Sequence, residues 1–424
     1  MNGIPSLATI LDDGTRSINW FNGRLVTAEA MTQDRKAIRE GLRSLGRTMG
    51  EGIVFGLEVS ETLGSSTASK PVVTITAGLA INGHGDVLRL CANADVPLLG
   101  VQPAELPTSA NGFENCLPPQ PGVYVAGEGV YLLVMGPATA KQGRAVVSGL
   151  GNTRSGCDSN YVIDGVAFRL LQIPLGQTDL DDVAHLRNVL AYRCFGVDQA
   201  TAPLADPFGA APPPQGPLET LRAAKQLTAC DVPLALIYWT SAGVQFIDIW
   251  PVRRRVTPPD GGGDQLGLLA DWTQSEADAR LLQFQQHIQS LRVSGSPPQH
   301  ASDAFRWLPP AGLLPLGGIA GAVGFDSTAF FSGFTTRGPV FIEGARVRAF
   351  LRLASSFPPI IVGDPELVWL YLVRENRQPL NGVTPKQPYL LFAVGRLPCQ
   401  MVPRYDVSHW NFANYALDDE RIGL

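Results

Sequence analysis

Charged residues are scarce in this chain. Lys, Arg, Asp and Glu make up 17% of the 424 residues, against about a quarter in an average soluble protein. Hydrophobic residues make up 45%, so the chain can bury cores, and disorder driven by excess charge is excluded. The net charge is −5, so the overall field does not attract nucleic acid or an anionic membrane surface. We therefore expect a folded protein without a nucleic-acid partner.

Long apolar runs are missing as well. No window approaches the roughly 18 uninterrupted apolar residues of a membrane-spanning helix. The first residues, MNGIPSLATILDDG, lack the basic and apolar regions of a secretory signal. We expect synthesis in the cytoplasm and no membrane insertion.

Cysteines are few and scattered, without a CxxC pair. This spacing predicts buried, reduced thiols rather than disulfides or a metal site. The six cysteines are Cys91, Cys116, Cys157, Cys194, Cys230 and Cys399.

The sequence signatures of common catalytic sites are also missing. The five histidines show neither HxxxH nor HExxH spacing, and there is no phosphate-binding loop, GxGxxG order or GxSxG elbow. Adjacent carboxylates such as Asp181 and Asp182 point to opposite faces of an extended chain, so adjacency alone makes no acid–base pair. We predict a protein that is not an enzyme and has no cofactor or metal. A hydrolase with a dispersed site is the remaining enzymatic alternative.

Glycine and proline are abundant, with 45 and 34 residues. Glycine and proline interrupt helices and strands, so this frequency favours short strands and many turns. Runs rich in Val, Ile and aromatic residues, bounded by Gly, Pro or Asn, predict strands at 72–75, 79–81, 87–90, 123–125, 129–135, 162–173, 234–239, 244–250, 340–342, 346–353, 367–373 and 389–394. His84-Gly85-Asp86 predicts a tight turn between two of them. The expected fold class is mixed and mainly β, with several β-rich domains, an N-terminal helix and a mid-chain helix.

Linkers divide the chain into four expected parts. The Pro/Gly-rich stretch 258–264 is the clearest boundary, and 202–217 is expected to form a surface loop. The parts are an N-terminal attachment segment with a helix (1–60), a β-rich domain (61–257), a linker and helix (258–300), and a C-terminal β-rich domain (301–424).

The first helix carries a heptad seam. Thr27 is a plausible N-cap, Glu29 suits the positive helix end, and Gly50 and Gly52 end the helix. Its apolar residues recur at spacings of 7, 4, 3 and 4, with Arg35 as the polar residue on the seam. They are Met31, Ile38, Leu42, Leu45 and Met49.

A second helix is predicted to begin with the capping box Thr273–Glu276. Its seam comprises Ala277, Leu281, Phe284, Ile288 and Leu291, and we expect His287 to lie off this seam in solvent. Either helix could lie on its own β-domain, because any amphipathic helix shows such spacing. Alternatively, the seams join copies of the chain, through Met31, Ile38, Leu42, Leu45, Met49, Leu281, Phe284, Ile288 and Leu291.

Several phrases resemble those of a known group of proteins. Residues 22–29 (NGRLVTAE), the charged helix, 52–59 (GIVFGLEV) and 77–82 (AGLAIN) are similar to uncharacterised proteins of contractile-tail gene clusters. These clusters encode phage tails and extracellular contractile injection systems. Further similar phrases occur at 231–235, 246–250 and 305–312. The resemblance implies a trimeric structural subunit associated with the baseplate, spike or tail fibre, with itself and other tail or baseplate proteins as partners.

One segment near the end of the chain suits ligand contact. Residues 405–415 are polar and aromatic without a clear period, which suits either a surface contact site or a C-terminal segment bound to a partner. A carbohydrate-binding receptor tip is therefore the alternative function, with Tyr405, His409, Trp410 and Tyr415 as contact residues.

Overall fold

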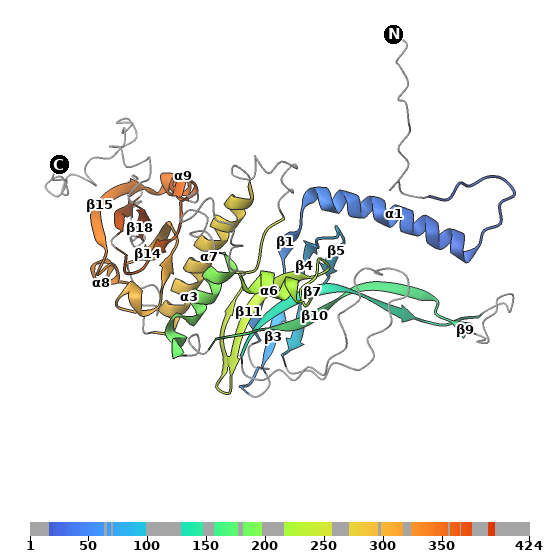
Figure 1. Cartoon of the computed structure of the whole chain (residues 1–424), viewed down its shortest axis with the longest axis horizontal. Helices are drawn as coiled ribbons and strands as arrows, with labels where there is room; N and C mark the ends of the chain where they lie inside the picture. The colour runs from blue at the N-terminus through green and yellow to red at the C-terminus, as the bar shows by residue number, and fades with distance from the viewer. Residues whose placement is uncertain are drawn as a thin grey trace, which may run out of the picture.

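The computed structural model describes residues 17–62, 66–68, 71–98, 129–146, 157–176, 181–196, 216–256, 271–295, 298–316, 324–354, 357–364, 366–374 and 389–394. The fold is mixed and mainly β, with an N-terminal helix, as the sequence predicts (Figure 1). The division into four parts stays a prediction. The predicted strand 123–125 lies outside the described residues.

The helices are α1 (Ala28–Met49), α3 (Val183–Cys194), α6 (Pro217–Ala223), α7 (Asp271–Val293), α8 (Ser327–Phe330) and α9 (Gly344–Ala354), with a 3₁₀ helix η2 (Ala301–Asp303). The strands are β1 (Gly52–Gly56), β2 (Val59–Glu61), β3 (Val72–Ile75), β4 (Gly78–Ile81), β5 (Val87–Leu90), β6 (Ala94–Pro97), β7 (Gly129–Gln142), β8 (Ala145–Val146), β9 (Cys157–Asp158), β10 (Tyr161–Ile173), β11 (Val232–Thr240), β12 (Gly243–Asp248), β13 (Trp307–Leu308), β14 (Ala311–Pro315), β15 (Thr335–Glu343), β16 (Ile360–Ile361), β17 (Leu367–Arg374) and β18 (Tyr389–Val394).

A four-stranded antiparallel sheet in the order β10-β7-β11-β12 forms the middle layer of the first part of the molecule. Its strand β7 is buried continuously over 130–135, because the sheet is covered on both faces. Successive residues of β7 therefore point into two different cores. This explains why the sequence of β7 is a continuous apolar run and does not alternate between apolar and polar residues.

One face of this sheet packs against two small three-stranded sheets, β1-β4-β5 and β2-β3-β6. Leu133 and Met135 of β7 share this core with Ile75 of β3 and Leu88 of β5. The turn between β4 and β5 forms as predicted: the Asn82 side chain accepts hydrogen bonds from the backbone amides of His84 and Asp86.

Helices α3 and α6 cover the opposite face of the sheet. Leu132 and Val134 of β7 pack with Leu186 and Leu190 of α3 and with Leu221 of α6. The first part of the molecule thus has three layers: small sheets, central sheet and helices.

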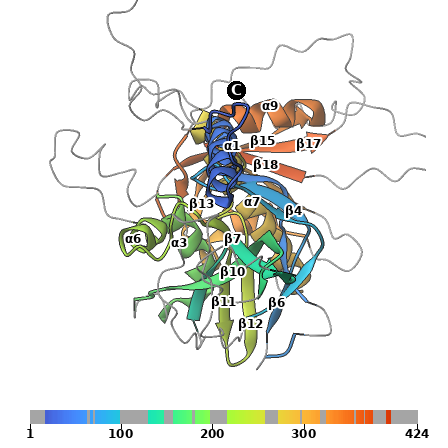
Figure 2. The ribbon, with the colours of Figure 1, turned by 90° about the vertical axis from the view of Figure 1, so that its right-hand side faces the viewer.

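The C-terminal part has its own sheet, in the order β14-β18-β17-β15. Phe284 and Ile288 of α7, Phe330 of α8, Phe350 of α9 and Phe392 of β18 share its core. Figure 2 shows strands of this sheet, with α9 beside them, on the other side of the molecule from β10, β11 and β12.

The predicted strand 346–353 is wrong, because these residues form α9. Arginines alternate with apolar residues there, which suggests a period of two. The buried residues are instead Val347, Phe350 and Ala354, spaced by three and four. That spacing places them on one face of a helix over the C-terminal sheet.

The two parts meet through α3 and the segment before β13. The Asn188 side chain accepts hydrogen bonds from the backbone amides of Arg306 and Trp307 and donates one to the Trp307 carbonyl. Tyr192 stacks on Trp307 with ring centroids 5.8 Å apart. These contacts, made by two residues one helical turn apart on α3, join the helix to the C-terminal part.

A buried polar cluster lies beside this junction. Arg187 Nε and Gln283 Nε2 both donate to Asp248 Oδ2, at 3.0 and 2.9 Å. His287 lies one turn further along α7, only 5% exposed, with its ring 4.8 Å from that of Phe305. The expectation that His287 is in solvent is therefore wrong. The C-terminal core covers a wider stripe of α7 than the apolar seam alone indicates.

Two further sequence expectations need correction. Helix α7 already includes Asp271, so Thr273 lies inside the helix and does not cap it. Cys230 is disulfide-bonded, and Cys91 is a free but exposed thiol, so the prediction of buried, reduced cysteines fails for both. It holds for Cys194, where burial raises the pKa of the thiol to about 12.

Burial of His287, with Arg187 nearby as a smaller contribution, holds the pKa of its imidazole well below the ordinary value of 6.5. The unfolded chain therefore binds a proton below about pH 6.5 that the folded chain does not bind. We expect the free energy of unfolding to fall as the pH drops below that value, with a slope of at most about 1.4 kcal/mol per pH unit from this residue. Urea unfolding of the wild type and of His287→Leu at several pH values measures it. Equal pH dependence in the two proteins would contradict the assignment.

Candidate assembly surface

Helix α1 is well defined at both ends. The Thr27 hydroxyl accepts a hydrogen bond from the Ala30 amide at 3.1 Å, which confirms the predicted N-cap. The helix ends at Met49, and Gly50 follows with a φ of 89°, a conformation that favours glycine. Its 22 residues form a long rod beside the first part of the molecule (Figure 1).

A contact between two glycines docks this rod. A Cβ atom added to Gly46 would lie 2.2 Å from the carbonyl oxygen of Gly85. Gly85 belongs to the β4–β5 turn, and its φ of 82° requires glycine there. The backbone of α1 therefore touches the backbone of the turn directly, which leaves no room for a side chain at position 46.

Guanidinium groups hold the same side of α1. Arg43 donates two hydrogen bonds to the buried Asp86 carboxylate, at 2.8 and 3.1 Å. Further along the helix, Arg39 reaches Asp164 of β10 at 2.5 Å, and Arg35 lies 3.7 Å from the same carboxylate. The bidentate pair between Arg43 and Asp86 fixes direction as well as distance. In Figure 2, α1 is viewed from the end that points away from the rest of the molecule.

The apolar seam of α1 is exposed. Its five predicted residues are between 53% and 63% exposed: Met31, Ile38, Leu42, Leu45 and Met49. A helix normally turns its apolar stripe toward a core. Here the described part of the chain leaves that stripe uncovered and holds the helix by its arginines.

The segment before α1 extends this surface. Trp20, Phe21, Leu25 and Val26 are exposed. The Arg24 guanidinium lies 5.6 Å from the Trp20 ring and 5.8 Å from the Phe21 ring, and it donates to the Asn19 carbonyl at 2.7 Å. The aromatic residues of the NWFNGR phrase are thus held together by Arg24.

The outer half of the β7–β10 hairpin lies beside α1. There β7 pairs with β10 alone, since β11 pairs with β7 only as far as Met135. Tyr161, Val162 and Ile163 are exposed on this two-stranded ribbon. Two strands alone are marginally stable in water, so the contact between Arg39 and Asp164 supports both elements.

The second predicted seam has a different environment. Phe284 and Ile288 are 1% and 2% exposed and belong to the core of the C-terminal part. Leu291 packs against that core, and Leu281 lines a pocket. This packing corresponds to the alternative in which the helix lies on its own domain. Phe284 and Ile288 are not available to a second copy.

The predicted ligand contacts Tyr405, His409, Trp410 and Tyr415 lie outside the described residues. In the described part of the chain, no cluster of three His, Cys, Asp or Glu residues could hold a metal ion. None of the described helices is long and apolar enough to cross a membrane.

The short basic run Arg253-Arg254-Arg255 has a structural role. Arg253 is buried and donates to the carbonyl oxygens of Gly56 and Leu57. The Arg254 guanidinium lies 5.2 Å from the Phe195 ring. The Arg253 and Arg254 side chains thus connect β1 and α3 to the end of the central sheet, and Arg255 is the exposed residue of the run.

No protein-family model matches the chain, and no curated protein matches it in sequence. Among solved structures, the chain is similar to one titled "Crystal structure of TssK", with a TM-score of 0.23 and 11% sequence identity. The similarity covers 91% of this chain and 94% of that chain. So low a score leaves the fold and the function to be argued from this chain itself.

Two glycines of α1 provide a matched pair of variants for the docking contact. Gly46→Ala places a methyl group against the Gly85 backbone and should weaken the docking of α1 by about 1–3 kcal/mol. Nothing lies within 4 Å of a Cβ at Gly41, so Gly41→Ala should instead stabilise the helix by up to about 1 kcal/mol. Hydrogen exchange of α1 and of the 82–86 turn measures both effects. The docking assignment fails if the two variants behave alike.

Proposed function

We propose that this protein is a structural subunit of a contractile tail or injection particle, and that its copies join through helix α1. The observation that carries the proposal is the exposed seam on a helix that its own chain holds by polar contacts. Large apolar side chains that lie exposed along one side of a helix are typical of a protein–protein contact. The protein has an assembly role here and no catalytic one.

Burial of the seam provides the driving force. Each of its five large side chains is more than half exposed, so covering one contributes roughly 1 kcal/mol. The orientation of α1 is set before assembly by Gly46, Arg43 and Arg39. A pre-oriented helix loses little conformational freedom on binding, which increases affinity.

The pair Leu42 and Ile38 of the seam favours an oligomer larger than a dimer. In heptad notation Arg35, Leu42 and Met49 occupy a positions, and Met31, Ile38 and Leu45 occupy d positions. Leucine at a with isoleucine at d shifts preference from dimers to trimers and tetramers. Arg35 extends toward Asp164, which draws its charge away from the seam.

The type of particle rests on the sequence resemblance. The phrases at 22–29, 52–59 and 77–82 resemble proteins of contractile-tail gene clusters, and they surround α1 in the chain. A trimer matches the three-fold axis of a tail spike. The proposed partners are two further copies and neighbouring baseplate or fibre proteins, in a particle assembled after synthesis in the cytoplasm.

Charge introduced into the seam tests self-association. Ile38→Asp with Leu42→Asp places two carboxylates per copy in the interface, and we expect the oligomer to dissociate to monomers in multi-angle light scattering. Each side chain is more than 60% exposed within its own chain, so folding should be retained, which circular dichroism checks.

Ser44→Asp is the control for Leu42→Asp. Ser44 is exposed and lies on a different side of α1 from the seam, so this variant adds one carboxylate to the same turn of the helix, as Leu42→Asp does, without entering the interface. Its oligomeric mass should equal that of the wild type. A wild-type protein that is monomeric at micromolar concentration, or a double variant that keeps its oligomeric mass, would refute assembly through this seam.

A further inference from the structure

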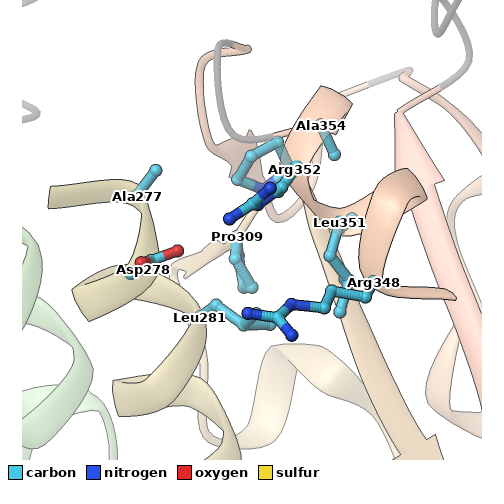
Figure 3. Close-up of a pocket in the computed structure, with 10 residues that line it drawn as sticks. Ala277, Asp278, Leu281, Pro309, Arg348, Leu351, Arg352 and Ala354 are labelled. Carbon is cyan, nitrogen blue, oxygen red and sulfur yellow. The ribbon is translucent and has the colours of Figure 1, made fainter. Parts of the chain in front are cut away.

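A pocket of 160 Å³ opens between α7 and α9 (Figure 3). Leu281 of α7, Leu351 of α9 and Pro309, which precedes β14, form part of an apolar floor. The Arg348 and Arg352 side chains extend over it from α9, and Asp278 lies on the opposite side, on α7 (Figure 3). The pocket therefore offers an apolar floor with guanidinium groups at its mouth.

The charge around the pocket favours an acidic occupant. Helix α9 carries Arg346, Arg348 and Arg352 and no acidic residue between Gly344 and Ala354. Asp278 offsets only part of this charge. Guanidinium groups one helical turn apart suit carboxylates, which they bind through charge-assisted hydrogen bonds. An apolar residue flanked by carboxylates fits both features of the pocket.

The chain itself continues from a point beside this pocket. Strand β18 ends at Val394, whose amide donates to the carbonyl of Pro310 at 2.9 Å, and Pro310 lines the pocket. Residues 395–424 follow. Within them, 417–424 read LDDERIGL and combine three acidic side chains and one arginine with three aliphatic side chains, so that the side chains carry a net negative charge. This composition is complementary to that of the pocket.

We propose that residues 417–424 occupy the α7–α9 pocket of their own chain. One aliphatic side chain of the segment fills the apolar floor, and carboxylates among Asp418, Asp419 and Glu420 pair with Arg348 and Arg352. Val394 is hydrogen-bonded to Pro310 at the pocket. The 24 residues from Val394 to Asp418 are therefore long enough to return to the pocket. Because occupant and pocket share one chain, the effective concentration is on the order of millimolar, so even a weak contact forms.

Charge reversal in the full-length protein tests the contact. We expect the backbone amides of 417–424 to exchange with deuterium on the order of tenfold more slowly in the wild type than in Arg348→Glu with Arg352→Glu. Asp418→Lys with Asp419→Lys should lose the same protection. Combining all four substitutions should restore a large part of it, because the pairs form again with opposite signs. High salt should reduce the wild-type protection.

The other end of the sequence supplies the control. Residues 10–13, Ile-Leu-Asp-Asp, have a similar composition, so Asp12→Lys with Asp13→Lys changes the same charge elsewhere. That variant should leave exchange of 417–424 unchanged. The proposal is overturned if the wild-type segment is unprotected, if reversal of the pocket charges has no effect, or if protection is lost on dilution, since the last result would place the segment on a second copy.

Discussion

The position of helix α1 depends on the contact between its Gly46 and Gly85 of the β4–β5 turn. The two backbones meet without an intervening side chain, so position 46 of the helix has no room for any residue larger than glycine. Arg43 then pairs with Asp86, the next residue of the turn, and Arg39 pairs with Asp164 on the β7–β10 ribbon. One glycine contact and two ion pairs therefore determine which face of the helix is turned outward.

Much of the β-structure is predictable from the sequence, because strands at the surface or between two cores leave direct local signals. The run in β7 and the strand 389–394, which matches β18 at both ends, are examples. Helix α9 is missed because alternating arginines imitate the period of a strand. The burial of His287 is not predicted, because the ring that packs against it belongs to Phe305, 18 residues further along the chain. Spacing within a helix contains no information about such a contact.

The two helical seams show the limit of spacing most clearly. Both repeat every three or four residues, yet the seam of α1 is exposed, whereas Phe284 and Ile288 of α7 are buried in the core of the C-terminal part. Periodicity measures whether a helix has an apolar face, not what covers that face. The difference lies in residues outside the seam: α1 has arginines and a glycine that dock it, and α7 has a sheet that follows it in the chain.

The polar docking of α1 bears on its role. A helix that only stabilised its own chain would gain from burying Ile38, Leu42 and Leu45 as well, because buried aliphatic side chains contribute more than most ion pairs. Here the ion pairs face the protein and the large apolar side chains face away. This arrangement costs stability in an isolated chain and is favourable only when another surface covers the seam. A second copy with the same seam meets that requirement without any further sequence, since a rotation about a symmetry axis brings identical apolar faces together.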